Sequence, residues 1–464
     1  MEWKGVRCLR GVEGVCWCGY LWVAVCMGDT AFVVVYSRDS KYSAYVVVAA
    51  VESTLRSVDV YMLRWDRDID VVERVARLGN RYRRVVVGFP ILTPQVLYVA
   101  HLVRLLRRYV PRAILVAGGP HATGDPLGTL TKLGFDVVVY GEGEDTVVEM
   151  LNEVDGGGDY RVCGTAYMDG DKLVVKKRSG CVDLDRYPPY PYWRELFCPI
   201  EIMRGCVSAC RFCQVSYMFG RPRYRSIERV VEYAEIMWSR GLRDLRFIAP
   251  NSFAYGSADG IRPNVSTVLE LLERLRSRAS RYGGRIFFGS FPSEVRPDSV
   301  VEDLVRELRK LVDNKRVIIG AQSGSNRVLK AIHRGHTIED VFEATEILLR
   351  YGFSVDIDFI FGLPGETRED IEATIKAMER LAMMGAKIHA HTFIPLPGTP
   401  FDSAPPGRVD PEVRKVVAKL IGLGKAYGEW IEQEKLAQMI HDLRAKRMVY
   451  TRREWASRAR FLYC

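Results

Sequence analysis

The sequence predicts an α/β protein in which a doubly wound parallel sheet is followed by a partial (β/α) barrel and a C-terminal helical segment. Over residues 28–152, short β-branched apolar runs alternate with stretches of helical periodicity, and no hairpin signal separates them. From residue 198 to residue 401, polar or glycine-rich motifs recur directly after predicted strands, at the spacing of repeated strand–helix units. The 464 residues are 48% hydrophobic and 27% charged, which is typical of globular rather than disordered chains.

The first 27 residues stand apart from this pattern because they crowd four cysteines into a short stretch: Cys8, Cys16, Cys18 and Cys26. A signal peptide is one interpretation. A metal site is another, although the spacing lacks the C-x-x-C of common zinc sites. We favour a third, an extension that is disordered or precedes the true translational start at Met27.

Five strands and three helices are predicted within residues 28–152. The strands are expected at 31–36, 58–63, 84–88, 113–117 and 136–140, and the helices at 43–51, 69–78 and 94–109. Strand–helix alternation without hairpins gives right-handed crossovers and a parallel sheet, whose ligands bind at the carboxyl ends of the strands. Two loops at such ends let the backbone approach a bulky ligand closely, Gly118-Gly119-Pro120-His121 and Gly141-Glu142-Gly143-Glu144.

Two less regular segments flank the predicted barrel. Residues 153–197 contain a hairpin, with strands at 162–168 and 173–177, followed by a proline-rich linker. Residues 402–464 are expected to be helical and basic, and seven Arg and Lys against Glu454 between residues 444 and 460 give +6 of the chain's +10. The basic stretch indicates either a solvated helix face or a surface for RNA.

Composition narrows the class further. Eleven cysteines are too few for a secreted disulfide scaffold, and no apolar run has the 18 or more residues of a membrane span. Asn and Gln number only 6 and 5, which suggests a thermophilic source. Because disulfides occur inside hyperthermophile cells, the remaining cysteines cannot be assumed to be reduced. We expect a cytoplasmic protein.

The strongest chemical signal is the motif formed by Cys206, Cys210 and Cys213. A short loop with this C-x-x-x-C-x-x-C spacing can turn three thiolates toward one [4Fe–4S] cluster. Three ligands leave one iron open for chemistry, whereas a structural zinc site requires a fourth ligand. Cys198 lies eight residues upstream and is wrongly placed to supply one.

Each strand predicted after this motif ends in residues that can bind a ligand. The strand at 245–249 is followed by Asn251 and Ser252, and the strand at 285–289 by Ser290 and Glu294. The strand at 317–321 precedes Gln322-Ser-Gly-Ser325 and, farther on, Arg334, while the strand at 354–361 precedes the turn from Gly362 to Gly365. Residues 393–400 form the last of these motifs.

Together these features resemble the radical S-adenosylmethionine (SAM) superfamily, in the subgroup with an N-terminal cobalamin-binding-like domain. The resemblance implies a Rossmann-like domain over 28–152 and a TIM-type partial barrel over 198–401. It implies SAM contacts from Phe212, Asn251, Ser290, Glu294, Gln322, Arg334, Gly362 and Gly365. It also implies cobalamin contacts from Gly118, Gly119, His121, Gly141 and Gly143.

One departure concerns the loop after the first strand. Mutase-type cobalamin domains carry a cobalt-ligating His there, whereas this chain has Ser37-Arg38-Asp39-Ser40-Lys41. We therefore expect cobalamin to bind with its dimethylbenzimidazole tail displaced and without an imidazole from that loop. The alternative is an empty Rossmann-like platform that only supports the barrel.

The resemblance implies reductive cleavage of SAM to a 5′-deoxyadenosyl radical, coupled to cobalamin-dependent methyl transfer to an unknown substrate. It also implies an electron donor such as ferredoxin or flavodoxin. Two alternatives remain. Transfer-RNA methylthiotransferases have a similar Gln322–Arg334 segment but need three more cysteines in the first domain, and residues 28–152 contain none. A non-catalytic cobalamin or redox sensor would release no 5′-deoxyadenosine. The residues Arg221, Arg223 and Arg225 could bind an anionic substrate or pair with barrel carboxylates.

Overall fold

The computed structural model describes residues 15–18, 21–24, 28–65 and 68–464. Near the N-terminus, β1 (Val15–Cys18) pairs antiparallel with β2 (Leu21–Ala24). The remaining residues of the first 27, including Cys8, Cys26 and Met27, lie outside the described residues. The expectations of an untranslated or disordered extension therefore stay predictions.

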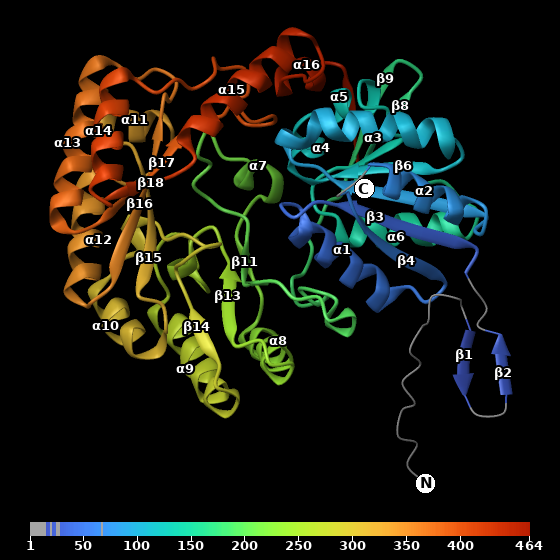
Figure 1. Cartoon of the computed structure of the whole chain (residues 1–464), viewed down its shortest axis with the longest axis horizontal. Helices are drawn as coiled ribbons and strands as arrows, with labels where there is room; N and C mark the ends of the chain where they lie inside the picture. The colour runs from blue at the N-terminus through green and yellow to red at the C-terminus, as the bar shows by residue number, and fades with distance from the viewer. Residues whose placement is uncertain (1–14, 19–20, 25–27, 66–67) are drawn as a thin grey trace.

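The first unit is the doubly wound sheet that the sequence predicts (Figure 1). Its five parallel strands lie in the spatial order β4-β3-β5-β6-β7. They are β3 (Thr30–Tyr36), β4 (Val58–Arg64), β5 (Arg84–Pro90), β6 (Ile114–Gly118) and β7 (Val137–Val139). The strand order reverses between β3 and β5, and a ligand crevice of such sheets opens at this point, beyond the carboxyl ends of the strands.

Helices cover both faces of this sheet because its strands are apolar on both sides. One face packs against α1 (Lys41–Thr54) and α6 (Glu144–Asp155). The other face packs against α2 (Asp68–Gly79), α3 (Val96–Tyr109) and α5 (Pro126–Thr131). A short helix, α4 (Gly119–Gly124), follows β6 directly.

The predicted hairpin extends the same sheet. It consists of β8 (Thr165–Asp169) and β9 (Lys172–Lys177), and β8 lies antiparallel to β7. Beyond it, β19 (Ala459–Tyr463) pairs parallel with β9, so the end of the chain completes an eight-stranded sheet. This strand lies in a segment, residues 402–464, that the sequence predicts to be helical.

The second unit is a partial barrel of two parallel sheets joined at one bridge, between Val295 and Ile319. One sheet contains β10 (Ile200–Glu201), β13 (Asp244–Ile248) and β14 (Arg285–Phe287). The other contains β15 (Arg316–Gln322), β16 (Ser354–Phe361), β17 (Lys387–Thr392) and β18 (Ala426–Tyr427). In Figure 1 the helices lie along the outside: α8 (Ile227–Ser239), α9 (Val265–Tyr282), α10 (Glu302–Leu311), α12 (Ile338–Arg350) and α13 (Arg368–Met384).

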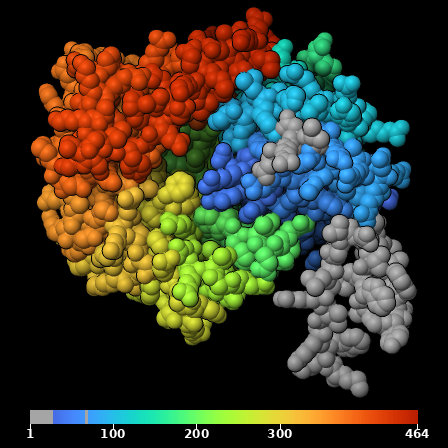
Figure 2. All heavy atoms as spheres, in the orientation of Figure 1, coloured from blue at the N-terminus to red at the C-terminus, as the bar shows by residue number. Residues whose placement is uncertain are grey.

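The C-terminal segment connects the two units. After α14 (Pro411–Gly422), the helices α15 (Trp430–Ala445) and α16 (Arg452–Ala456) run from the barrel to the first sheet (Figure 1). Figure 2 shows this segment, in red, along one side of the molecule, with a hollow between the two units. Among the described residues, no helix is both long and apolar enough to cross a membrane.

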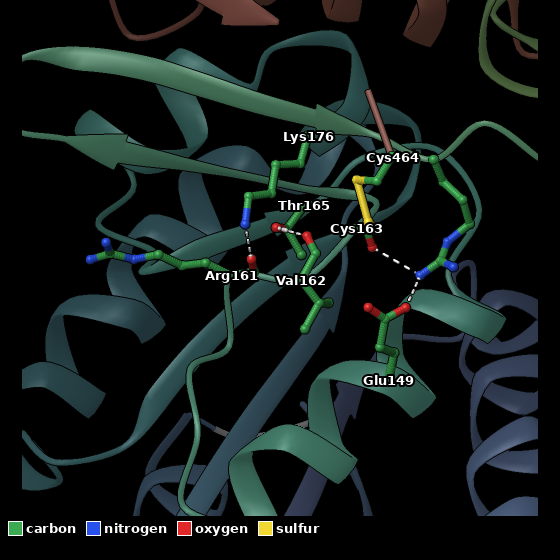
Figure 3. Close-up of a disulfide and its surroundings, with 8 residues drawn as sticks. Glu149, Arg161, Val162, Cys163, Thr165, Lys176 and Cys464 are labelled. Carbon is green, nitrogen blue, oxygen red and sulfur yellow. Dashed lines mark hydrogen bonds and ion pairs between the residues drawn. A yellow bond between two sulfur atoms is a disulfide. The ribbon is translucent and has the colours of Figure 1, made fainter. Parts of the chain in front are cut away.

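A disulfide between Cys163 and Cys464 fastens the end of this segment (Figure 3). Backbone hydrogen bonds flank it, since the amide of Cys464 donates to the carbonyl of Lys177 (3.0 Å) and Ser179 donates to the carbonyl of Cys464 (2.9 Å). Arg178 donates to the Cys163 carbonyl (3.0 Å) and pairs with Glu149 of α6. The bond closes a loop of 301 residues.

Candidate active site between the two units

The three motif cysteines lie in the loop between β11 (Met203–Arg204) and β12 (Arg223–Tyr224), which pair antiparallel. The Cys206 amide donates to Gly220 (2.9 Å), and the Cys213 amide donates to Cys210 (3.0 Å). All three are free thiols. Burial raises the pKa of the Cys213 thiol to about 12.

No described cysteine offers this loop a fourth sulfur. The Cys198 thiol instead donates to the Pro189 carbonyl (3.7 Å). The Arg334 guanidinium approaches Cys210, with Nη1 3.8 Å from Sγ. Three free thiols in one loop, with Cys210 beside a cation, fit a [4Fe–4S] cluster with one open iron, because a hydrogen bond to a sulfur stabilises added negative charge.

The side chains of Arg334, Gln322 and Glu294 converge on Gly320 of β15. A Cβ at residue 320 would lie 2.3 Å from Arg334 Nη2, 2.7 Å from Gln322 Nε2 and 3.2 Å from Glu294 Oε2, so only glycine fits. Arg334 donates to the Gly320 carbonyl from Nη2 (2.7 Å). Burial raises the pKa of Glu294, and Arg334 opposes that shift. The structure therefore brings three of the predicted SAM residues to one point.

A register shift in β15 explains how Gln322 reaches this point. The pairing with β16 shifts between Gly320 and Gln322, and Gln322 has a φ of 77°. That left-handed conformation is uncommon for residues other than glycine, and such irregularities re-aim side chains beside functional sites. Gln322 is 4% exposed.

Two buried serines lie near these residues without a partner. Asn251 already donates to Ser299 (2.7 Å) and accepts from the Arg296 amide (3.2 Å). By contrast, the hydroxyls of Ser252 and Ser290 have no hydrogen-bond partner among the described residues. A buried hydroxyl without a partner is costly, so these two positions suit a polar ligand.

The remaining predicted SAM residues are less tightly grouped. Phe212 is partly buried against the barrel core. The turn from Gly362 to Gly365 precedes α13, and the Gly365 carbonyl accepts from Arg327 (2.7 Å). Burial raises the pKa of Glu366, at the end of this turn, to about 7, and its carboxylate accepts from the Leu363 amide (2.9 Å).

A cavity of about 300 Å³ opens in the first unit. Four of the predicted cobalamin residues line it, Gly118, Gly119, Gly141 and Gly143. Gly119 has a φ of 88°, and a Cβ there would lie 3.0 Å from the Ile91 backbone. The other lining residues are mainly apolar and come from the strands of the first sheet, from α1 and from α6. The second unit completes the wall with Cys198, Pro199, Glu201, Arg204, Met218, Phe219 and Ile248. A cavity with apolar and glycine walls fits the flat, largely apolar body of a corrin or its tail.

The structure does not place His121 in this cavity. Its side chain is 1% exposed, and Nδ1 lies 3.3 Å from the Thr93 hydroxyl. Nε2 has no partner among the described residues. Burial lowers the His121 pKa to about 4, so the imidazole is neutral.

A cluster of charges that was not predicted from the sequence joins the two units at the rim of the cavity. Arg204 of β11 pairs with Glu142 (2.8 Å) and Glu144 (2.7 Å) of the glycine loop and with Glu201 (2.6 Å). Burial alone would raise the Glu144 pKa, but the charge and hydrogen bonds of Arg204 lower it. The signal was present in Gly141-Glu142-Gly143-Glu144, where acidic residues alternate with the glycines that drew attention.

The neighbouring arginines are also engaged. Arg223 pairs with Glu142, and the buried Arg225 donates to the carbonyls of Glu201 (3.1 Å) and Tyr187 (3.0 Å). Arg221 is exposed. Arg223 therefore pairs with a carboxylate of the glycine loop rather than of the barrel, and Arg225 binds backbone carbonyls.

Comparisons with known proteins agree with this division into two units. A model of the B12 binding domain matches residues 33–151, and a model of the radical SAM superfamily matches residues 200–378. An uncharacterized protein of Methanopyrus kandleri is 28% identical over 64% of this chain and 63% of its own length, so the chain spans just under two thirds of that relative. An uncharacterized methyltransferase of Pyrococcus horikoshii is 26% identical over 73% of this chain and 75% of its own length. A tRNA-2-methylthio-N(6)-dimethylallyladenosine synthase of Chromohalobacter salexigens is 32% identical, over 43% and 44% of the two chains.

Two solved structures share the fold. The radical SAM methyltransferase TsrM of Kitasatospora setae, with cobalamin and a [4Fe–4S] cluster bound, aligns with a TM-score of 0.65 over 83% of this chain and 76% of its own. OxsB, a cobalamin-dependent SAM radical enzyme, aligns with a TM-score of 0.62 over 76% and 52% of the two chains. Identities of 17% and 15% limit both likenesses to the fold.

The two family matches identify two cofactor-binding domains in the chain. A radical SAM domain uses a [4Fe–4S] cluster and SAM, and it needs an electron donor. The B12 binding domain supplies a site for cobalamin. Residues 200–378 therefore form a domain of the radical SAM superfamily, and a B12-binding domain over residues 33–151 precedes it.

Proposed function

We propose that this protein is a cobalamin-dependent radical SAM methyltransferase that cleaves SAM reductively and methylates a substrate held in the barrel. The observation that carries the proposal is a direct contact between the two cofactor loops. Gln214 follows the third cluster cysteine, and its Nε2 donates to the carbonyl of Pro120 (3.1 Å), which follows the cavity residue Gly119. The helix α7 (Val215–Phe219), next in the chain, contributes Met218 and Phe219 to the cavity wall.

When bound, the reduced cluster supplies the electron that cleaves SAM, and cobalamin carries the methyl group. The protein's own residues have separate tasks. Cys206, Cys210 and Cys213 hold the cluster, and their loop leaves one iron for SAM. Arg334 and Gln322 bind SAM beside Gly320, where Arg334 offers a fixed positive charge for the carboxylate.

The cavity glycines admit the cobalamin tail, and the Arg204 cluster keeps the glycine loop against the radical SAM domain. Because no histidine lines the cavity, we propose that cobalamin binds without an imidazole from this part of the chain. We propose a ferredoxin or flavodoxin as the electron donor.

The Cys163–Cys464 disulfide and the absence of cysteine between residues 28 and 152 disfavour the two-cluster tRNA methylthiotransferase alternative.

The test is anaerobic reconstitution with iron, sulfide and hydroxocobalamin, followed by incubation with SAM and a low-potential reductant. We expect about four irons and one cobalamin per chain, and release of 5′-deoxyadenosine and S-adenosylhomocysteine, measured by mass spectrometry. Release of 5′-deoxyadenosine with no retained cobalamin would reduce the proposal to a radical enzyme without methyl transfer. Cobalamin retention with no SAM cleavage would instead favour a sensor.

A further inference from the structure

The inner face of the barrel carries a carboxylate and two imidazoles that the proposed function does not yet use. His389 Nδ1 lies 2.7 Å from the Oδ1 atom of Asp358. His391 Nε2 lies 3.1 Å from His389 Nδ1 and 3.6 Å from the same Asp358 oxygen. Burial alone would raise the Asp358 pKa, but hydrogen bonds from the two histidines lower it, so Asp358 is ionised.

The cluster faces the space that holds the predicted SAM residues. Gly320, Asp358, His389 and Tyr427 are in-register neighbours on β15, β16, β17 and β18. In-register neighbours on parallel strands project from the same face of a sheet. A Cβ on Gly320 would point at Arg334, Gln322 and Glu294, so the Asp358 and His389 side chains project to that side. The negative charge of Asp358 also contributes to the raised pKa of Glu294, behind burial.

The hydrogen bonds of Gln433 determine which ring nitrogen of His391 carries the proton. Its Oε1 accepts from the Thr392 amide (2.8 Å), a group that can only donate. Its amide nitrogen therefore faces His391 Nδ1 (3.1 Å), which must accept. The proton of a neutral His391 is then on Nε2, the atom directed at Asp358 and His389. A metal ion needs a lone pair on that atom, so this network opposes a metal site formed by the three residues.

His389 is left with one free nitrogen. Its Nδ1 carries the proton donated to Asp358, so Nε2 has a lone pair. No described residue hydrogen-bonds to Nε2, and the His389 side chain is 26% exposed. The ring stacks on Tyr427 with centroids 4.4 Å apart and planes at 13°, which fixes its direction. An imidazole oriented by a carboxylate, with its other nitrogen open, is the arrangement of a general base.

We infer that His389 Nε2 accepts a hydrogen bond, and then a proton, from an N–H or O–H group of the substrate. In this step the substrate N–H or O–H bond breaks and its electron pair stays on the substrate atom. A new N–H bond forms at Nε2, and Asp358 stabilises the imidazolium while remaining ionised. Because Asp358 is negative, the group bound here is neutral or cationic: an ammonium, a phenol or a heteroaromatic N–H. The inference rests on the proposed function, which makes the barrel the reaction chamber.

The first test needs no substrate. Holoenzyme with ¹⁵N-labelled histidine and an oxidised cluster is studied by long-range ¹H–¹⁵N spectroscopy, and signals are assigned with His389→Gln and His391→Gln. The chain has seven histidines, and the exposed His441 gives a matched control, His441→Gln. We expect His389 as the Nδ1–H tautomer in the wild type and a shift toward Nε2–H in Asp358→Ala. Asp358→Asn keeps an acceptor oxygen and guards against a folding defect.

Three outcomes would overturn the inference: a His389 that carries its proton on Nε2, a tautomer unchanged by Asp358→Ala, or one zinc per chain that both histidine variants lose. The last would assign a metal site instead.

The second test separates this inference from the proposed function. Methyl-tritiated SAM is supplied with a metabolite extract of the cells that make the protein, and label transfer is divided by 5′-deoxyadenosine release. We expect this ratio to fall about 100-fold in His389→Gln, a typical loss for a general base. An unchanged ratio would refute the role of His389. If the wild-type protein transfers no label, that result contradicts the proposed methyl transfer but says nothing about His389. The histidine spectra of the first test then decide whether His389 has the predicted tautomer.

Discussion

Gln214 joins the two halves of the site, because its amide nitrogen lies 3.1 Å from the Pro120 carbonyl oxygen and 2.7 Å from that of Pro397. Pro120 belongs to the first unit, whereas Pro397 lies in the segment after β17. One side chain, adjacent to Cys213, thus contacts the glycine loop of the cavity and the end of the barrel. A movement of either loop would be transmitted to the position of the cluster.

Replacing Cys206, Cys210 and Cys213 together with Ala should abolish cluster binding, because no other described cysteine lies in their loop. Iron analysis and visible absorption after reconstitution check this, with Cys181→Ala, at an exposed free cysteine, as the control. Retention of about four irons per chain in the triple variant would show that the cluster lies elsewhere.

Arg334→Ala and Gln322→Ala should each weaken SAM binding by roughly 1.5–3 kcal/mol, the cost of a lost hydrogen bond to a charged group. Titration calorimetry on protein with an intact cluster measures the change. Lys330→Ala, at an exposed position between the two residues, should leave the affinity as it is. If both site variants bind SAM normally, the convergence on Gly320 serves structure alone.

Ala44→Trp should abolish cobalamin retention, because Ala44 lines the cavity and is 1% exposed, so an indole would fill the space. The spectrum after incubation with hydroxocobalamin and removal of the excess reports the result. Ser53→Trp, at an exposed position on the same helix, is the matched control. Wild-type levels of cobalamin in Ala44→Trp would place the cofactor outside this cavity.

Arg204→Gln should destabilise the protein by about 3–5 kcal/mol at neutral pH, because it leaves buried carboxylates without their cation. In the wild type the Glu144 pKa is lowered from 4.5, so its contribution to stability is present above about pH 4.5 and is lost as the pH falls through the lowered pKa. In the variant, burying Glu144 without its cation costs less free energy when the carboxyl is protonated. The loss of stability caused by Arg204→Gln should therefore be smaller at pH 5 than at pH 8. Denaturant unfolding at several pH values measures both trends.

The matched control for this experiment is Arg262→Gln. The Arg262 side chain is 90% exposed and 3.9 Å from Asp259, so its removal should cost little. Equal effects of the two substitutions at neutral pH would contradict the assignment of Arg204 as the main link between the glycine loop and the barrel.

Cys464→Ser should lower stability by about 2–4 kcal/mol, the usual contribution of a disulfide, because the unfolded chain regains the freedom of a long loop. Thermal unfolding without reductant checks this, with Cys181→Ser as the control. Reductant should bring the wild type to the level of Cys464→Ser. An identical wild-type transition with and without reductant would mean that the bond adds nothing.

Local sequence patterns were sufficient to predict strands that are marked by an apolar run of their own. The apolar runs at 31–36 and 84–88 became β3 and β5, while the cysteine spacing leaves the assignment of the cluster loop a prediction. What escaped prediction depends on partners far along the chain. The pairing of β19 with β9 and the bond from Cys163 to Cys464 join segments about 300 residues apart, and neither leaves a periodic trace. The acidic residues of the Arg204 cluster are visible in the glycine loop, but nothing in the local pattern shows that Arg204, 60 residues further along the chain, is the partner of Glu144.

In the candidate site, too, some residues could be predicted from the sequence and others depend on contacts that only the fold creates. Gln322 and Arg334 were predicted from a family resemblance and converge on Gly320. Asn251 was predicted on the same basis, yet its amide is occupied by Ser299 and the Arg296 backbone. The pairing of Asp358 with His389 could not be anticipated, because strand register decides which side chains meet, and a slip of one residue would turn each to the opposite face.

The position of β19 has a consequence for how the protein is made. The ribosome synthesises β19 after the whole barrel. The outer edge of β9 therefore stays unpaired while more than 280 further residues are synthesised. An unpaired strand edge is a template for association with other chains. A nascent chain stalled before residue 459 therefore exposes this edge and should need chaperone protection that a chain containing β19 does not.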